Sequence, residues 1–250
     1  MGMERGTTID IIDSDLPAGK GLSSSAAICC LIVRCLNLAH GLGLDVREEM
    51  RLAYEGERLT PSKCGQLDQA CIYGPETCVY MTFDGDAQPA CEVIDPPNGG
   101  DIHLVVCDLN GKKDTIQILR DLQMAYDAGD VDLRAALGSR NRRHVSDCVE
   151  AIKRGDAKAL GRTYVEAQAT FDAATRHLCS ELEAPLLRGL LDDVDRDVPE
   201  TVFGSKGVGS QGDGAAQFVC PSESMSFKLR QYLHSRNLDA YAVTIRSRSS

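Results

Sequence analysis

The chain has 250 residues, of which 43% are hydrophobic, and its net charge is −10 at pH 7. This length and composition are typical of a globular protein with one large domain or two modest ones. The negative charge argues against nucleic acid or an anionic membrane as a partner, since both are themselves negative. The longest apolar run, residues 26–33, is too short to cross a bilayer.

Eleven cysteines are present, mostly within apolar runs, and none are spaced as Cys-x-x-Cys. This pattern favours buried free thiols in a reducing compartment over a disulfide framework or a thiolate zinc site. No secretory signal is recognisable, so we expect a cytoplasmic protein.

The first expected elements are a short strand over residues 7–12 and a buried helix over residues 26–40 that ends at Gly41. Between them Gly19 and Gly21 permit the close backbone approach of a phosphate cradle, and Lys20 adds a positive charge. The unpaired N–H groups at the start of the helix would face an anion.

Three hydroxyls, Ser23, Ser24 and Ser25, stand where helix-capping residues belong. An ordinary serine cap after a glycine turn therefore remains the alternative to a phosphate site. The stretch does not match the Walker A pattern, in which Gly-Lys is followed by Ser or Thr after a four-residue spacer.

Asp45 and Glu48 predict a capping box for a helix over residues 46–59, which Pro61 stops. A short helical segment over residues 66–73 follows. The elements after it are a strand over 77–83, a turn at 84–85, a loop at 96–100, a strand over 103–108, helices over 115–128, 131–137, 141–153, 156–171 and 182–192, a strand over 216–220, a helix over 222–234 and a strand over 240–245. The change to polar helices near residue 115 predicts two domains, 1–115 and 116–250.

Two carboxylates are candidates for chemistry. Glu57 lies in the last turn of its helix, where the negative end of the dipole disfavours an acid, so we expect a positive partner. The alternative is a surface pair with Arg51 or Arg58. Asp68 lies among apolar neighbours just inside a short helix, which predicts partial burial and a cation, metal or hydroxyl partner; simple helix capping is the alternative.

A second glycine-rich stretch contains five glycines between residues 204 and 214. So much backbone freedom is typical of a loop that approaches another backbone or a ligand, although a plain flexible loop remains an alternative. Two glycine loops and two carboxylates are the components of phosphoryl transfer: donors for phosphates, oxygen ligands for magnesium, and a carboxylate for the acceptor hydroxyl.

Three motifs resemble those of the GHMP small-molecule kinases, the family of galactokinase, homoserine kinase, mevalonate kinase and phosphomevalonate kinase. Pro17-Ala-Gly-Lys-Gly-Leu-Ser-Ser-Ser-Ala26 resembles the family's Pro-x-x-x-Gly-Leu-Ser-Ser-Ser-Ala phosphate loop. Tyr54-Glu-Gly-Glu-Arg58 resembles the segment that supplies the magnesium glutamate, here Glu57. Cys64-Gly-Gln-Leu-Asp-Gln69 resembles the Cys-Gly-x-x-Asp-Gln of galactokinases, with Asp68 as the aspartate.

Residues 206–214 resemble the family's late glycine loop, although Gln211 and Asp213 depart from its usual small residues. The resemblance implies an α+β fold, with a ribosomal S5 domain 2-like N-terminal domain and a ferredoxin-like C-terminal domain. It also implies ATP and Mg²⁺, with Ser25 and Glu57 holding the metal and Asp68 orienting or deprotonating the acceptor. The residues implied to contact ATP are Pro17, Gly19, Lys20, Gly21, Leu22, Ser23, Ser24, Ser25, Ala26, Gly209, Ser210 and Gly212.

The Cys-Gly-x-x-Asp-Gln form favours a sugar as the small-molecule substrate. Few residues precede Pro17, whereas family members carry a substantial segment there. We therefore expect an N-terminally truncated chain with an exposed sheet edge, through which it self-associates.

Two alternatives to an active kinase remain. The first is a catalytically impaired homologue that acts as a sugar and nucleotide sensor or as one half of a split enzyme. The second is a hydrolase with Cys64 or Ser24 as nucleophile and one of five histidines as base. These are His40, His103, His144, His177 and His234.

Overall fold

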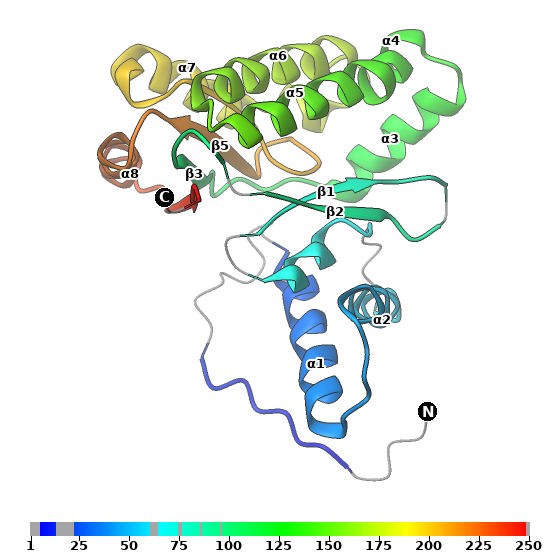
Figure 1. The fold of residues 1–250 in the computed structure, drawn as a ribbon. Helices are drawn as coiled ribbons and strands as arrows, with labels where there is room; N and C mark the ends of the chain where they lie inside the picture. The colour runs from blue at the N-terminus through cyan, green and yellow to red at the C-terminus, as the bar shows by residue number, and fades with distance from the viewer. Residues whose placement is uncertain are drawn as a thin grey trace. The chain divides into compact units, whose positions relative to one another are not determined.

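The computed structural model describes residues 6–13, 23–60, 65–74, 77–85, 87–95 and 97–248. The chain divides into two compact units, Met1–Ile94 and Asp95–Ser250 (Figure 1). This boundary precedes the one expected at residue 115. The reason is that strand β3 (Ile102–Asp108) pairs with strands near the end of the chain and so belongs to the second unit.

The first unit is built from three helical segments and a hairpin. These are α1 (Ser24–His40), α2 (Val46–Arg58), the 3₁₀ helix η1 (Asp68–Tyr73) and the antiparallel strands β1 (Cys78–Thr82) and β2 (Ala90–Ile94). The helical segments enclose a small core of Cys30, Met50, Ala53 and Ile72. This packing holds α1, α2 and η1 against one another.

Local signals define the two long helices of this unit. The predicted capping box of α2 is confirmed: Asp45 Oδ1 accepts from the N–H of Glu48 at 2.9 Å, and Glu48 Oε2 accepts from the N–H of Asp45 at 2.9 Å. Helix α1 ends as predicted at Gly41, whose φ of +59° lies in the left-handed region that glycine tolerates.

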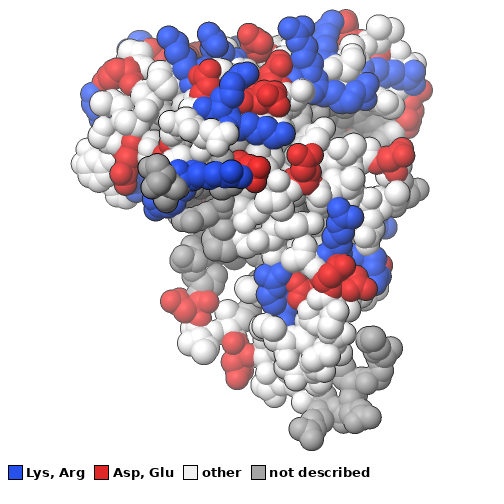
Figure 2. Space-filling model, in the orientation of Figure 1, with Lys and Arg blue, Asp and Glu red and all other residues white. Residues whose placement is uncertain are grey.

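Two expectations for the N-terminal part are wrong. Residues 6–13 form no strand, because a strand needs a pairing partner and the described residues provide none. Helix α1 is not buried all round: Ile28, Leu31 and Leu38 are 42%, 62% and 77% exposed. Accordingly, the surface over α1 in Figure 2 is largely uncharged.

The second unit is a four-stranded antiparallel sheet with helices on both faces. The strand order is β4-β5-β3-β6, where β4 is Gly204–Gly207, β5 is Ala215–Cys220 and β6 is Ala240–Ile245. Its helices are α3 (Thr115–Asp127), α4 (Val131–Ala135), the π-helical η2 (Ala136–Arg140), α5 (Asn141–Arg154), α6 (Ala157–Thr175), the 3₁₀ helices η3 (Ser180–Glu183) and η4 (Pro199–Thr201), α7 (Pro185–Asp197) and α8 (Glu223–Ser235).

The alternation of side chains along β3 sets these layers. Val105 and Cys107 pack in one core cluster with residues of α7 and α8, whereas Ile102 and Leu104 pack in another with residues of α5 and α6. Charges of both signs are interspersed over the second unit on the face shown in Figure 2. No helix of the described residues is long and apolar enough to span a membrane.

Candidate active site

The N-terminus of α1 is the centre of the candidate site. Pro17, Gly19, Lys20, Gly21 and Leu22 lie outside the described residues, as do all residues from 14 to 22. The description resumes at the residue that precedes the helix, so the three serines and Ala26 can be placed.

Ser23 has an unusual backbone and an unexpected partner. Its φ of +55° lies in the left-handed region, which is uncommon for a residue with a Cβ. Its hydroxyl does not cap α1 but donates to Asp68 Oδ2. The interpretation of Ser23 as a capping hydroxyl is therefore wrong, and the hydroxyl instead joins the helix start to η1.

No side chain of the described residues caps α1, and the first backbone bond runs from the N–H of Ala27 to the carbonyl of Ser23 at 3.1 Å. The backbone N–H groups of Ser24, Ser25 and Ala26 precede that bond. Such groups at the positive end of a helix bind phosphate and other anions.

Ser25 and Glu57 form the second contact at this helix start. The Ser25 hydroxyl donates to Glu57 Oε1 at 2.6 Å, and the Gln69 amide donates to Glu57 Oε2 at 2.7 Å. Glu57 is only 2% exposed. Each of its carboxylate oxygens therefore has a hydrogen-bond donor, one from α1 and one from η1.

The alternative of a surface ion pair for Glu57 is wrong. Arg51 instead pairs with Glu55 at 2.7 Å, and Arg58 donates to the Tyr54 hydroxyl at 3.1 Å. The expected positive partner is not seen either, because no lysine or arginine of the described ranges forms an ion pair with Glu57. Among the described residues, the side-chain donors to this buried carboxylate, Ser25 and Gln69, are both neutral.

The short helix η1 presents its first two residues in different environments. Asp68 is exposed, so its expected partial burial is wrong, whereas Gln69 is fully buried. Consecutive residues of a 3₁₀ helix point about 120° apart. The helix can therefore direct Asp68 to Ser23 and Gln69 to Glu57 at the same time.

Three thiols near these groups have shifted pKa values. A hydrogen bond between the Cys30 and Cys71 thiols lowers the pKa of Cys71 to about 7 and raises the pKa of Cys30, which burial raises further. Burial and the nearby Glu57 carboxylate raise the pKa of Cys29. All cysteines of the described residues are free, and Cys71 is exposed.

The donor set of Ser25 and Glu57 suits magnesium. Mg²⁺ prefers oxygen ligands and commonly binds one or two carboxylates together with waters and substrate phosphates. Within the described ranges, no group of three or more His, Cys, Asp and Glu side chains could hold a metal by itself. A hydroxyl and a carboxylate in contact fit a metal that is shared with a phosphate ligand.

In the second unit, the late glycine loop joins β4 to β5. Gly209 and Gly212 have φ values of +63° and +69°, so both positions use the left-handed region. The Ser210 hydroxyl lies 3.5 Å from the Thr115 hydroxyl at the start of α3. The loop is thus a tight turn held against α3.

The two residues that depart from the family's loop pattern have structural roles. The Gln211 amide donates to the Gly207 carbonyl at 3.2 Å, and Lys113 Nζ donates to the Gln211 carbonyl at 3.0 Å. Asp213 Oδ1 accepts from the N–H of Leu187 at 2.9 Å, near the start of α7. Both residues therefore hold the loop by hydrogen bonds within the second unit.

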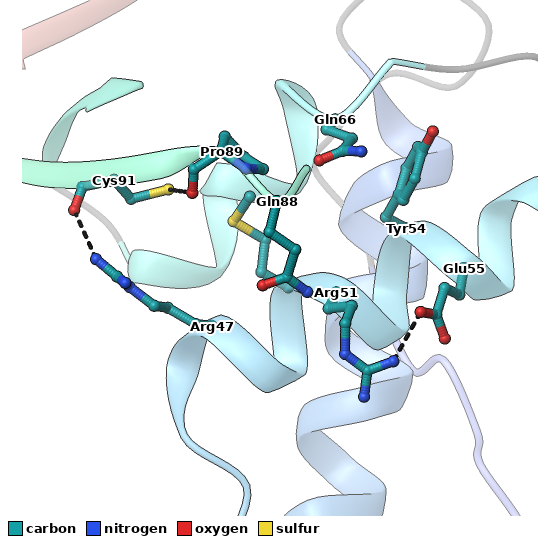
Figure 3. Close-up of a pocket in the computed structure, with 9 residues that line it drawn as sticks. Arg47, Arg51, Tyr54, Glu55, Gln66, Gln88, Pro89 and Cys91 are labelled. Atoms are coloured by element: carbon teal, nitrogen blue, oxygen red, sulfur yellow. Dashed lines mark hydrogen bonds and ion pairs between the residues drawn. The ribbon is translucent and has the colours of Figure 1, made fainter. Parts of the chain in front are cut away.

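A pocket of about 160 Å³ lies beside α2 in the first unit (Figure 3). It is lined by α2, by Gln66 and by the chain around Pro89, and Arg47 donates across it to the Cys91 carbonyl at 3.3 Å. Ser25, Glu57 and Asp68 do not line it. The pocket is therefore separate from the two serine and carboxylate contacts.

The described histidines that form hydrogen bonds contact threonines, not a nucleophile. His40, His103 and His144 contact the hydroxyls of Thr7, Thr244 and Thr170 at 2.6, 3.3 and 3.2 Å, respectively. Cys64, the other nucleophile candidate, lies outside the described residues. These contacts lend no support to the hydrolase alternative.

Comparisons with known proteins agree with this description. Residues 1–75 match the family model of the GHMP kinases N terminal domain. A search of curated protein sequences gave no significant match. Among solved structures, L. major mevalonate kinase in complex with R-mevalonate is similar, with a TM-score of 0.71 and 18% identity over 91% of this chain and 66% of that one.

Two further structures show the same likeness. Lactococcus lactis galactokinase complexed with galactose has a TM-score of 0.61 and 18% identity over 94% of this chain and 68% of that one. Streptococcus pneumoniae phosphomevalonate kinase has a TM-score of 0.69 and 17% identity over 90% of this chain and 71% of that one. The chain thus spans about two thirds of the length of these proteins.

The fold is the two-domain α+β architecture of these kinases, which confirms the fold class predicted from the sequence. Residues 1–75 match the N-terminal domain model of the GHMP kinase family, and the chain shares the fold of the kinases of that family. Members of this family are ATP-dependent phosphotransferases that act on hydroxyl groups.

Proposed function

We propose that this chain is an ATP-dependent small-molecule kinase that transfers the γ-phosphoryl group of ATP to a hydroxyl of a sugar. The observation that carries the proposal is the pair of contacts at the start of α1. The Ser23 hydroxyl bonds Asp68, and the Ser25 hydroxyl bonds the buried Glu57. One helix terminus therefore lies beside the two carboxylates that phosphoryl transfer requires.

The uncapped N–H groups of Ser24, Ser25 and Ala26 are suited to donate to phosphate oxygens. Gly19, Lys20 and Gly21 would extend this cradle by sequence position. The proposal also assigns Gly209, Ser210 and Gly212 of the second unit to nucleotide binding, by their resemblance to the family's late loop.

Ser25 and Glu57 would hold Mg²⁺. Bound Mg²⁺ supplies charge neutralisation to the phosphate oxygens during transfer. The residues themselves provide a hydroxyl and a carboxylate oxygen that already lie 2.6 Å apart, so little rearrangement is needed to present both to one ion.

Asp68 would act on the acceptor hydroxyl. It is exposed, and its Oδ2 accepts from a hydroxyl, that of Ser23. An acceptor hydroxyl bound in the same way would be oriented by the carboxylate, which could also take its proton. Positioning and charge neutralisation would then account for most of the rate enhancement.

The Cys64-Gly-Gln-Leu-Asp-Gln69 motif supports a sugar as the acceptor, since it resembles the form found in galactokinases. The similar solved structures include a galactokinase with galactose and a mevalonate kinase with R-mevalonate. The motif makes a sugar the proposed acceptor, and the assay compares it with the acceptors of the other similar kinases.

The experiment measures magnesium-dependent ADP release from ATP with galactose, other hexoses, R-mevalonate, phosphomevalonate and homoserine as acceptors. The proposal predicts release with at least one hexose and none above background without an acceptor. Release with R-mevalonate, phosphomevalonate or homoserine alone would replace the sugar by that acceptor. Binding of sugar and nucleotide without release would favour the sensor or split-enzyme alternative.

A further inference from the structure

Gln69 is the neighbour of Glu57 on the side away from Ser25. Its side-chain amide donates to Glu57 Oε2 at 2.7 Å, while the Ser25 hydroxyl donates to Oε1 at 2.6 Å. The two donors come from different elements, η1 and α1. The orientation of the carboxylate is therefore fixed from both sides.

The burial of this group makes the Gln69 contact consequential. Gln69 is 0% exposed and Glu57 is 2% exposed, so solvent does not replace a lost donor at Oε2. A buried carboxylate without its donors is strongly disfavoured and tends to reorient toward the donors that remain. A neutral amide avoids this without adding a positive charge that would repel a cation.

We propose that Gln69 is a positioning residue for magnesium: it binds Oε2 of Glu57 and so holds Oε1 toward Ser25 as the metal-binding oxygen. This inference rests on the proposed function, because it assigns a role within the same site. In this proposal η1 contributes two residues to the site: Asp68 for the acceptor hydroxyl and, next to it, Gln69, whose amide orients the Glu57 carboxylate.

The test separates metal binding from nucleotide binding. Isothermal titration calorimetry measures the dissociation constant of ADP with MgCl₂ and again with EDTA, for the whole chain and for the variants Gln69→Leu and Gln88→Leu. Gln88 is exposed, so the second variant makes the same chemical change where no carboxylate is oriented. A manganese titration followed by electron paramagnetic resonance gives the metal affinity directly.

Loss of an outer-shell hydrogen bond to a metal ligand typically weakens metal affinity about 10–100-fold. Gln69→Leu should therefore weaken Mn²⁺ binding by about that factor, while the ADP dissociation constant in EDTA changes less than about 2-fold. Gln88→Leu should match the wild type in both measurements. Thermal unfolding checks that each variant folds, and Gln69→Met replaces the leucine variant if that one does not.

Three results would overturn the inference. Unchanged Mn²⁺ affinity in a folded Gln69→Leu chain would show that Gln69 does not position the carboxylate. Equal weakening of ADP with and without metal would make Gln69 a general structural residue. Failure of the wild type to bind Mn²⁺ or to gain ADP affinity from magnesium would refute the proposed function as well.

Discussion

We expect the substitution Glu57→Gln to raise the unfolding free energy of the chain while it lowers the magnesium-dependent activity. The substitution keeps the shape of a side chain that is 2% exposed and removes its charge. Both neighbours can adapt, because the Ser25 hydroxyl donates or accepts and the Gln69 amide carries both a donor and an acceptor. A glutamine at position 57 can therefore form both hydrogen bonds.

The two hydrogen bonds to Glu57, at 2.6 and 2.7 Å, are bonds to a charged group. Such bonds contribute about 1.5–3 kcal/mol, against about 0.5–1.5 kcal/mol for neutral ones, so the variant loses roughly 2 kcal/mol over both. Removing a buried charge that has no ion-pair partner among the described residues recovers several kcal/mol of desolvation. The net expectation is an increase in unfolding free energy of about 1–2 kcal/mol.

The assay is thermal unfolding of the whole chain in EDTA without nucleotide, followed by circular dichroism. For a unit of about 100 residues, 1 kcal/mol corresponds to about 4–8 °C in Tm. Magnesium-dependent ADP release should meanwhile fall more than about 100-fold, because the carboxylate ligand is gone. Glu55→Gln is the matched control: Glu55 is exposed and paired with Arg51, and its loss should change stability by less than about 1 kcal/mol.

A decrease of more than about 1 kcal/mol in the unfolding free energy of Glu57→Gln would refute this reasoning. It would mean that the charge itself stabilises the fold, as expected for a structural ion pair. Retained magnesium-dependent activity would contradict the assignment of Glu57 to the metal.

The remaining predictions concern a thiol and two glycines. Cys71 is exposed, and the Cys30 thiol lowers its pKa to about 7, so iodoacetamide should label it faster than an ordinary thiol at neutral pH. Because the thiolate is the form that reacts, the labelling rate should rise with pH through about 7. Peptide mapping measures this rate. An unreactive Cys71 at pH 7.5 would contradict the thiol contact. Gly204→Ala should destabilise by about 1–3 kcal/mol in urea unfolding, because its Cβ would lie 2.0 Å from the Gly161 carbonyl oxygen. Gly189→Ala, in an open position of α7, should stabilise by about 0.5–1 kcal/mol, and a loss of stability there would show an unrecognised contact.

Elements with strong local signals could be predicted from the sequence. Asp45 and Glu48 predicted the start of α2, and Gly41 predicted the end of α1, because caps depend on residues a few positions apart. Strand β2 was not predicted. Its five residues alternate only weakly between apolar and polar side chains, and its pairing with β1 is a contact between separate segments of the chain. The unit to which β3 belongs depends on strands more than 100 residues later.

The burial of α1 shows the limit of composition as a guide. Ile28, Leu31 and Leu38 are apolar but exposed, because burial requires a neighbouring element and the sequence of a helix does not supply one. The exposed Ile11 and Ile12 illustrate the same point for the expected strand.

In the site, residue types were predictable but their partners were not. Glu57 and Asp68 were identified by motif, whereas their contacts with Ser25 and Ser23 follow from how α1, α2 and η1 pack. Gln69 belongs to the motif, but no role was predicted for it. A signal existed, since it is a polar residue inside a short apolar segment, but its role depends on where Glu57 lies.

The central claim is that Asp68 and Glu57 serve one phosphoryl-transfer site at the start of α1. The most direct measurement compares the wild type with Asp68→Asn, using the rate of ADP formation with magnesium and a hexose acceptor together with the Kd for ADP in magnesium. Removing a catalytic base costs about 10²–10⁴-fold, so the account predicts that loss in kcat with a Kd within about 3-fold. Retained turnover in Asp68→Asn, or turnover and ADP binding lost together in that variant, would contradict it.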